Sequence, residues 1–296
     1  MQLSARGASL MLVLVTLIWG GGFVASEFAM RGGMGPTWIL LFRFVIGSIV
    51  VLVCFFRQIR HASKRSALHG IVAGILLYFG FLTQIVGQSM TTVPNTAFLT
   101  STNVIMVPFF IWVFARRRPR PRVFVLCLVA MVGTLLLTMD GELRLTPSLG
   151  DGLVLLCAFL YAAHIAFLDL VCSSDPSVPV TFWQLLTCAV LSAVSLFLFP
   201  LPMDLSVLRS NLLPVLYLGL FSTGACYLMQ TKAQTVLSGP RASIVMSLEG
   251  FFGTVLSLLA GLADFRPAMA LGGLLITGAV ICSTISDASQ PGQALP

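Results

Sequence analysis

Two ionisable residues lie inside long apolar stretches of the sequence, where a charge is costly. Arg43 interrupts the apolar run 37–56, and Glu249 interrupts the run 242–263. A charge inside a bilayer costs roughly 2.5–3.5 kcal/mol on insertion scales, so it needs a partner or a function. The guanidinium can bind an anionic group such as a carboxylate, and the carboxylate can bind a cation or a proton. The alternative is a structural ion pair, or a link to backbone carbonyls.

Aromatic and polar side chains in the apolar stretches extend this set. His164 lies three residues after Tyr161, on the same helical face, where it can carry protons or stay neutral and hydrogen-bond another helix. The rings can stack on a substrate or pack in the core, and the amides can line a cavity or join helices. The candidates for substrate binding or coupling are Trp19, Arg43, Tyr78, Asn95, Asn103, Tyr161, His164, Trp183, Gln184 and Glu249. Three further amides of this class are Gln84, Gln88 and Gln230.

The sequence lacks the common catalytic, nucleotide-binding and metal-binding patterns. HExxH, GxSxG and the Walker pattern GxxxxGK[ST] are absent, and so is a pair of intramembrane aspartates suited to acid–base cleavage. The seven cysteines stand singly, without a CxxC pair, as small core residues do. We therefore expect no enzymatic activity, no cofactor and no metal site.

The composition places these residues in a membrane protein. Charged residues make up 9% of the 296-residue chain, whereas soluble proteins contain about 25%. Apolar residues make up 57% of the chain, and the mean hydropathy is +0.99. The 17 basic and 10 acidic residues are too few to cover a soluble surface of this size. The two soluble domains that the length alone suggests are therefore excluded.

Runs without charged residues define the expected membrane-spanning segments, because about 20 apolar residues cross a bilayer as a helix. The 50-residue run 66–115 is long enough for two helices, which the polar sequence TTVPN at 91–95 divides. The first run is longer than the apolar core of a signal peptide, so we expect it to be retained. We predict an all-α integral membrane protein with ten transmembrane helices, within residues 7–26, 37–56, 66–115 (two helices), 123–139, 152–168, 176–203, 210–231, 242–263 and 267–286.

The distribution of lysine and arginine predicts the orientation. The loops after the second and fourth predicted helices contain Arg57, Arg60, Lys64, Arg65, Arg116, Arg117, Arg118, Arg120 and Arg122. The loops after the first, third and fifth helices contain only Arg31 and Arg144. We therefore expect both termini in the cytoplasm and the chain in the inner (plasma) membrane. The basic run 116–122 is expected to lie on anionic headgroups rather than to bind nucleic acid.

Landmarks in the first half of the chain recur in the second half. A shift of 142 residues aligns Trp19 with Tyr161, and a shift of 146 residues aligns Asn103 with Glu249. Each half then contains five helices, and because five is odd, the second half enters the membrane from the opposite side. Inverted repeats of this kind are a feature of secondary transporters, whose two halves can exchange conformations.

We therefore divide the chain into two repeats, residues 1–145 (helices 1–5) and residues 146–296 (helices 6–10 with a short C-terminal tail). A channel is less consistent with this duplication, because an odd number of helices per repeat favours alternating access over a fixed pore.

Several short motifs occur in a fixed order along the chain, namely LIWGGGFVA at 17–25, FRF at 42–44 and SLE at 247–249. They resemble the first-helix motif, a second-helix element and part of the ninth helix of the EamA family of the drug/metabolite transporter superfamily. Gly250 departs from the family pattern, which often has proline there. The resemblance covers nearly the whole chain and implies a ten-helix transporter that moves a small metabolite, amino acid or drug-like molecule, often outward.

Together these observations predict a secondary transporter of small organic solutes that exports them by alternating access. The expected partners are a small-molecule substrate and the lipid bilayer, with a homodimer as an option and no nucleic acid. Two alternatives remain at this point, namely a non-transport membrane scaffold and an intramembrane enzyme without a recognised motif.

Overall fold

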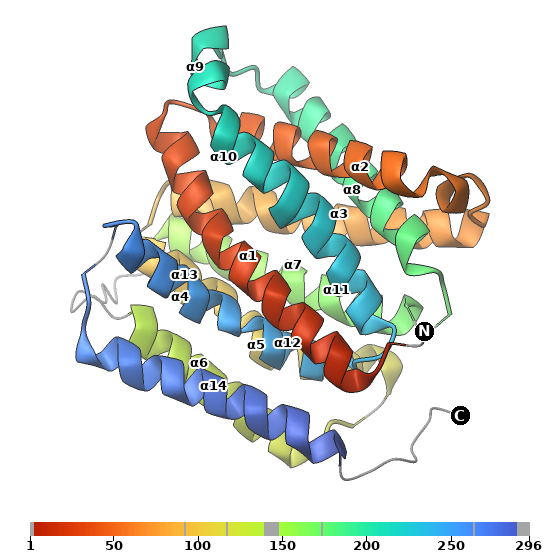
Figure 1. The fold of residues 1–296 in the computed structure, drawn as a ribbon, viewed down its shortest axis with the longest axis vertical. Helices are drawn as coiled ribbons and strands as arrows, with labels where there is room; N and C mark the ends of the chain where they lie inside the picture. Colours follow the sequence, from red (N-terminus) through yellow and green to blue (C-terminus); the bar gives the residue numbers. More distant parts are fainter. Residues whose placement is uncertain are drawn as a thin grey trace.

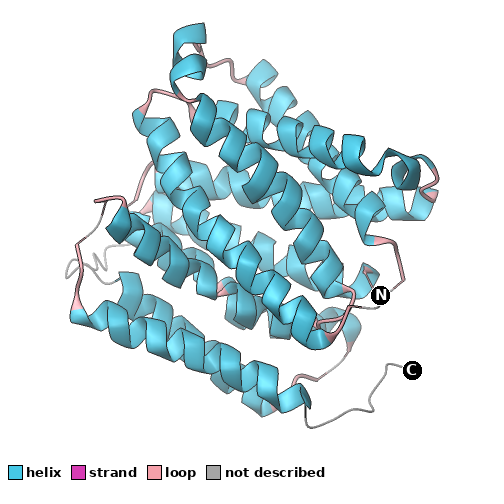
Figure 2. Cartoon of the chain, viewed as in Figure 1, coloured by secondary structure: helices cyan, strands magenta, loops and turns pink. Residues whose placement is uncertain are grey.

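The computed structural model describes residues 3–91, 93–116, 118–138, 148–172, 174–262 and 264–288. Within these ranges every regular element is a helix (Figure 2). The helices are α1 (Ala5–Arg31), α2 (Pro36–Arg60), α3 (Lys64–Gln88), α4 (Val93–Ser101), α5 (Asn103–Ala115), α6 (Pro121–Thr138), α7 (Leu149–Val171), α8 (Ser177–Leu198), α9 (Leu205–Ser210), α10 (Leu212–Leu216), the π-helix η1 (Tyr217–Ala225), α11 (Cys226–Gln234), α12 (Gly239–Met246), α13 (Leu248–Leu259) and α14 (Pro267–Ala288).

Eight helical segments in the described ranges are long and apolar enough to cross a membrane, so the chain is a multi-pass membrane protein. They are α1, α2, α3, α7, α8, the continuous segment α10–η1–α11, the segment α12–α13, and α14. Two shorter apolar stretches are Phe98–Phe114 in α4–α5 and Pro121–Leu137 in α6. They lie where the fourth and fifth of the ten predicted helices are expected. Arg144, which enters the orientation prediction, and the predicted repeat boundary at 145 lie outside the described residues.

Local sequence explains where several helices begin. Ser4 accepts a hydrogen bond from the backbone N–H of Gly7 at the start of α1. Ser148 and Asp151 form a reciprocal capping box at the start of α7. These side chains satisfy backbone N–H groups that have no partner within the helix. The helix α7 therefore begins three residues before the start that its uncharged run predicted.

Helices from the two halves pack against each other instead of forming separate bundles. Counting spans from the start of each half, α1 corresponds to α7, and α3 to α10–η1–α11. The contacts show the same correspondence. The first span of each half packs on the third span of the other half: α1 packs on η1 and α11, and α7 packs on α3. Likewise α1 packs on α12 and α13, and α7 packs on α4 and α5. Figure 1 shows α6 and α14, the last helix of each half, side by side at one edge of the bundle.

Glycines let α6 and α14 approach each other closely. A β-carbon added to Gly272 would collide with the carbonyl oxygen of Gly133, and one added to Gly133 would lie 2.8 Å from the carbonyl oxygen of Gly272. The obstacles are backbone atoms, so neither helix can relieve the contact by a side-chain rotation. Small residues play this part in membrane helix packing, where close van der Waals contact holds helices together.

Gly272→Ala is therefore expected to lower the free energy of unfolding by about 1–3 kcal/mol, the usual cost of overpacking. Gly278→Ala on the same helix is the matched control, because its added β-carbon would meet no atom within 4 Å. Alanine has the higher helix propensity, so Gly278→Ala should be neutral or stabilising. Thermal unfolding of the purified variants in detergent measures both changes. Equal shifts for the two variants would contradict this account of the interface.

The connection between α7 and α8 is anchored on the start of α3. The Asp175 carboxylate accepts a hydrogen bond from the Ser66 hydroxyl at 2.8 Å, and its other oxygen lies 2.9 Å from Nδ1 of His69. Arg65 Nε lies 3.6 Å from the same carboxylate. Burial by itself raises the pKa of Asp175, but the hydrogen bonds from Ser66 and His69 and the charge of His69 outweigh it, so the pKa is lower than usual.

Asp175→Asn is expected to destabilise the protein near neutral pH and to matter less in acid. Because the pKa of Asp175 is lowered on folding, its contribution is fully present above the ordinary aspartate pKa of about 3.9 and is lost as the pH falls through the lower folded value. The difference in melting temperature between wild type and variant should thus shrink between about pH 5 and about pH 3. Asp204→Asn is the control, because Asp204 is exposed and makes no side-chain cap. A difference that does not change with pH would contradict the prediction.

Candidate functional site

Two spans, one in each half, are interrupted near their middle by a single residue that keeps helical dihedral angles. The α4–α5 span changes helix at Thr102, and the α12–α13 span changes helix at Ser247. The Thr102 hydroxyl donates to the carbonyl of Leu99, and the Ser247 hydroxyl donates to the carbonyl of Ile244, each at 2.6 Å. Hydroxyl groups that bond to a carbonyl one turn earlier compete with the backbone ladder and bend helices. The two interruptions therefore share the same local hydrogen bond.

The third span of the second half contains the π-helix η1. A π-helical turn is wider than an α-turn, and such turns are frequent at functional sites. The carbonyl of Ser222 in η1 accepts a hydrogen bond from the indole Nε1 of Trp19 at 2.8 Å. The side chains of Ser222 and Thr223 contact Arg43 in α2. The segment η1 thus links α1 and α2 at the level of the two helix breaks.

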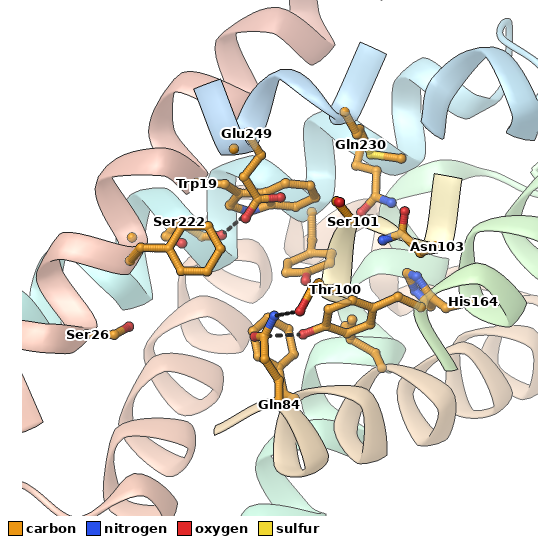
Figure 3. Close-up of a pocket in the computed structure, with 18 of the residues that line it drawn as sticks. Trp19, Ser26, Gln84, Thr100, Ser101, Asn103, His164, Ser222, Gln230 and Glu249 are labelled. Carbon is orange, nitrogen blue, oxygen red and sulfur yellow. Dashed lines mark hydrogen bonds between the residues drawn. The ribbon is translucent and has the colours of Figure 1, made fainter. Parts of the chain in front are cut away.

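A cavity lies between the two broken spans and the helices α1, α2, α3, α7 and η1–α11. It contains about 1150 Å³ of space not occupied by atoms, open solvent included. Both halves contribute to its walls. Six of the ten residues that the sequence singled out line it, namely Trp19, Arg43, Asn103, Tyr161, His164 and Glu249. The additional amides Gln84, Gln88 and Gln230 line it as well (Figure 3).

Three of the ten candidates lie outside this lining. Tyr78 is buried and hydrogen-bonds the Ser195 hydroxyl of α8. Trp183 packs against α3 at Gly70. Gln184 does not line the cavity but contacts a residue that does. Its amide oxygen hydrogen-bonds His164 at 3.0 Å, and its amide nitrogen contacts Thr231 at 3.4 Å. The tenth candidate, Asn95, belongs to α4, but its side chain is outside the described part of the chain.

Arg43 is held firmly at the cavity wall. Its Nε donates to the Thr223 hydroxyl at 3.0 Å and its Nη2 to the Ser222 hydroxyl at 3.4 Å. Its guanidinium carbon lies 4.3 Å from the centre of the Phe81 ring, within cation–π distance. The residue is only 7% exposed. Among the described residues no carboxylate lies within ion-pair distance of it, so its charge is oriented but not neutralised.

Removing the Thr223 hydroxyl should leave Arg43 less firmly held and the protein less stable. Valine has nearly the shape of threonine, and in Thr223→Val the buried Nε of Arg43 loses its acceptor at a cost of about 1–3 kcal/mol. We expect the free energy of unfolding to fall by that amount, which thermal unfolding of the purified variant in detergent measures. Thr83→Val is the control, because the Thr83 hydroxyl bonds only carbonyls of its own helix. Equal effects of the two variants would exclude a positioning role for Thr223.

Glu249 lies in the first turn of α13, directly after the second helix break. Its side chain lines the cavity near Trp19 (Figure 3). In the part of the chain that the structure describes, no side chain or backbone N–H within hydrogen-bond distance donates to its carboxylate. Glu249 and Arg43 do not form an ion pair within 4 Å. The direct ion pair considered from the sequence is therefore absent, although both residues line the same cavity.

A hydrogen-bond network across the cavity includes residues that the sequence did not single out. The Tyr161 hydroxyl donates to the amide oxygen of Gln84 at 3.3 Å, and the Gln84 amide nitrogen donates to the Thr100 hydroxyl at 3.3 Å (Figure 3). Thr100 and Ser222 were not predicted, because hydroxyl groups are common in membrane helices and most bond to their own backbone. The interruption at Thr102, two residues after Thr100, was not predicted either.

Comparisons with known proteins are consistent with this arrangement. The sequence model of the EamA-like transporter family matches residues 6–139 and again residues 148–285. A protein from Archaeoglobus fulgidus named as an uncharacterized transporter is 28% identical over 93% of this chain and 84% of its own. The uncharacterized inner membrane transporter YicL of Salmonella typhimurium is 23% identical over 96% of this chain and 97% of its own. A known crystal structure has the same fold, with a TM-score of 0.80 and 18% identity over 98% of this chain and 100% of the other.

Proposed function

The chain belongs to the EamA-like transporter family, and from this premise we propose that it is a secondary transporter that moves small organic solutes by alternating access. The fold we propose has ten transmembrane helices arranged as two inverted repeats. Three observations support it. The family model matches each half separately, and the two short apolar stretches lie where the two remaining helices are expected. Corresponding helices of the two halves also make corresponding contacts with the other half.

The observation that carries the proposal is the cavity between two broken helices. Transporters built from repeats often bind substrate where discontinuous helices meet at the repeat interface, because the helix ends there offer unpaired polar groups. In this chain Thr100, Ser101 and Asn103 reach the cavity from one break, and Ser247 and Glu249 reach it from the other. A scaffold protein would have no need for two charges that line one cavity and are not paired with each other.

Hydrogen bonds join α7, α11, α12 and α1 at one end of the bundle, the end expected to face the cytoplasm. The backbone N–H of Gly239 in α12 donates to the Asp169 carboxylate of α7 at 2.6 Å. Gln234 donates to the carbonyl of Ile165 at 2.9 Å. Arg241 donates to the Ser9 hydroxyl of α1 at 3.2 Å. Of these three, the contact between Arg241 and Ser9 joins the two halves, so a movement of one half against the other would have to break it.

We place the protein in the inner (plasma) membrane with both termini in the cytoplasm, and we propose export as the direction of transport. The positive-inside distribution of the basic loops supports this orientation. The name of the Salmonella relative as an inner membrane transporter supports the location.

The proposal is tested by counterflow in liposomes. Purified protein is reconstituted with a mixed pool of amino acids and other small metabolites, and exchange against the labelled pool is measured with and without a pH gradient. We expect saturable exchange that empty liposomes lack. A dependence on the gradient would identify proton coupling. A folded protein that exchanges no compound of a broad pool would overturn the transporter proposal.

A further inference from the structure

We propose that Gln184 fixes the tautomer of His164, so that Nδ1 of the imidazole accepts a hydrogen bond from a solute in the cavity. Gln184 does not line the cavity and acts only through the histidine, as a positioning residue. The role of Nδ1 in solute binding rests on the proposed transport function. The tautomer is a property of the protein alone, so it can be measured without any solute.

The side-chain amide of Gln184 in α8 is oriented by Thr231 in α11. The Thr231 hydroxyl donates its single proton to the carbonyl of Tyr227 at 2.8 Å, so toward Gln184 it can only accept. The amide nitrogen of Gln184 lies 3.4 Å from this hydroxyl, which leaves the amide oxygen directed at His164. Gln184 and Thr231 are completely buried, so water does not compete for these groups.

This orientation determines which nitrogen of His164 carries the proton. The amide oxygen of Gln184 lies 3.0 Å from Nε2 of the ring, and a carbonyl oxygen only accepts hydrogen bonds. Nε2 is therefore the donor. The histidine is 2% exposed, and burial favours the neutral imidazole, which has one N–H. The hydrogen bond at Nε2 thus leaves Nδ1 with an unshared electron pair, ready to accept.

Nδ1 is accessible from the cavity. His164 lines the cavity (Figure 3), whereas the Gln184 amide that bonds Nε2 lies outside the lining. Among the described residues Nδ1 has no hydrogen-bond partner, and it is not one of the fully buried polar atoms that lack a partner. It therefore contacts the open space of the cavity, where an O–H or N–H group of a solute can donate to it. The cavity thus offers a neutral acceptor in addition to the charged Arg43 and Glu249.

Nitrogen-15 NMR of protein labelled at histidine measures the tautomer, because the chemical shift of each ring nitrogen depends on whether it is protonated. The chain contains three histidines, and the signals that disappear in His164→Gln identify His164. We expect the wild type to carry the proton on Nε2 and none on Nδ1. In Gln184→Met the acceptor is lost, and in Thr231→Val the Gln184 amide can turn around, so both variants should show a fraction protonated on Nδ1.

Gln234→Met is the matched control for the tautomer. It also removes a buried amide that joins α11 to α7, where Gln234 donates to the carbonyl of Ile165 beside His164 in the sequence. It does not bond the imidazole, so the tautomer should not change. A wild-type His164 protonated on Nδ1 or on both nitrogens would overturn the proposal, and so would equal spectra of the wild type, Gln184→Met and Thr231→Val. Because valine keeps the shape of threonine, Thr231→Val supplies the answer if Gln184→Met does not fold.

Two substitutions of His164 separate solute binding from a purely structural role. Asparagine can place an amide oxygen at the position of Nδ1, whereas glutamine can place an amide N–H at the position of Nε2 and keep the bond to Gln184. We expect the labelled pool of amino acids and metabolites to exchange at least about threefold faster in His164→Asn than in His164→Gln. Equal rates or the reverse order would overturn the role of Nδ1 in binding. If the wild type exchanges no compound, that role fails together with the proposed function, and the spectra still decide the tautomer.

Discussion

Replacing Glu249 with glutamine is expected to lower solute exchange roughly 30-fold or more, equivalent to about 2 kcal/mol, while the protein stays folded, because it removes a carboxylate that lines the proposed transport cavity. Glutamine preserves the size of the side chain and its place in the first turn of α13. The carboxylate accepts no hydrogen bond within the described structure, so its removal leaves no protein donor unsatisfied. The loss should therefore appear in transport and not in thermal stability.

Glu27→Gln is the matched control for this variant. Glu27 forms a 2.7 Å ion pair with Arg31 one turn away on the same helix, and it does not line the cavity. Pairs of this kind contribute only a few tenths of a kcal/mol, so exchange should change less than about twofold. Counterflow rates at matched protein density compare the two variants. A Glu249→Gln protein that exchanges solute at the wild-type rate would remove Glu249 from the site.

Arg43→Gln is expected to have an effect of similar size, and Arg43→Lys should recover only part of it. Lysine keeps the positive charge and three N–H donors, but all three are on one nitrogen, so it cannot reproduce the planar guanidinium that bonds Thr223 and Ser222 through two separate nitrogens. The geometry of the guanidinium, more than its charge, keeps Arg43 away from Glu249. Exchange should thus decrease from wild type to Arg43→Lys and further to Arg43→Gln. Arg31→Gln, at an exposed position, is the control.

The double variant Arg43→Gln/Glu249→Gln distinguishes a binding site from a hidden structural ion pair. If the two residues stabilised each other directly, each single variant would leave a buried charge unpaired, and the second substitution would restore about 3–5 kcal/mol. Because no ion pair joins them in the described structure, we expect little coupling in the free energy of unfolding. Exchange should remain low in the double variant. Restored stability in the double variant would contradict the geometry described above.

The sequence was sufficient to predict the membrane class, most of the helices and the two charges of the site. Arg43 and Glu249 are visible because a charge inside an apolar run contrasts with its neighbours. Helix starts such as that of α1 depend on side chains within one turn. The chain's membership of a transporter family could also be inferred, because short motifs in a fixed order need no knowledge of distances.

The tertiary structure alone decided which of the other candidates face the cavity. Trp19 and Tyr161 line it, whereas Trp183 and Tyr78 lie in contacts between helices. Sequence patterns could not separate these pairs, because lipid is as apolar as the protein interior. A membrane helix therefore lacks the contrast between a polar and an apolar face that marks orientation in soluble proteins.

The partners of Arg43 were hidden for a different reason. Ser222 and Thr223 reach it from a π-helical turn, and the wider turn changes which residues share a face, so the ordinary helical spacing gives the wrong neighbours. The separation of Arg43 from Glu249 likewise depends on how helices from both halves pack. Residue types and spacing along the chain could identify the charges, but distances between helices exist only once the helices have packed together.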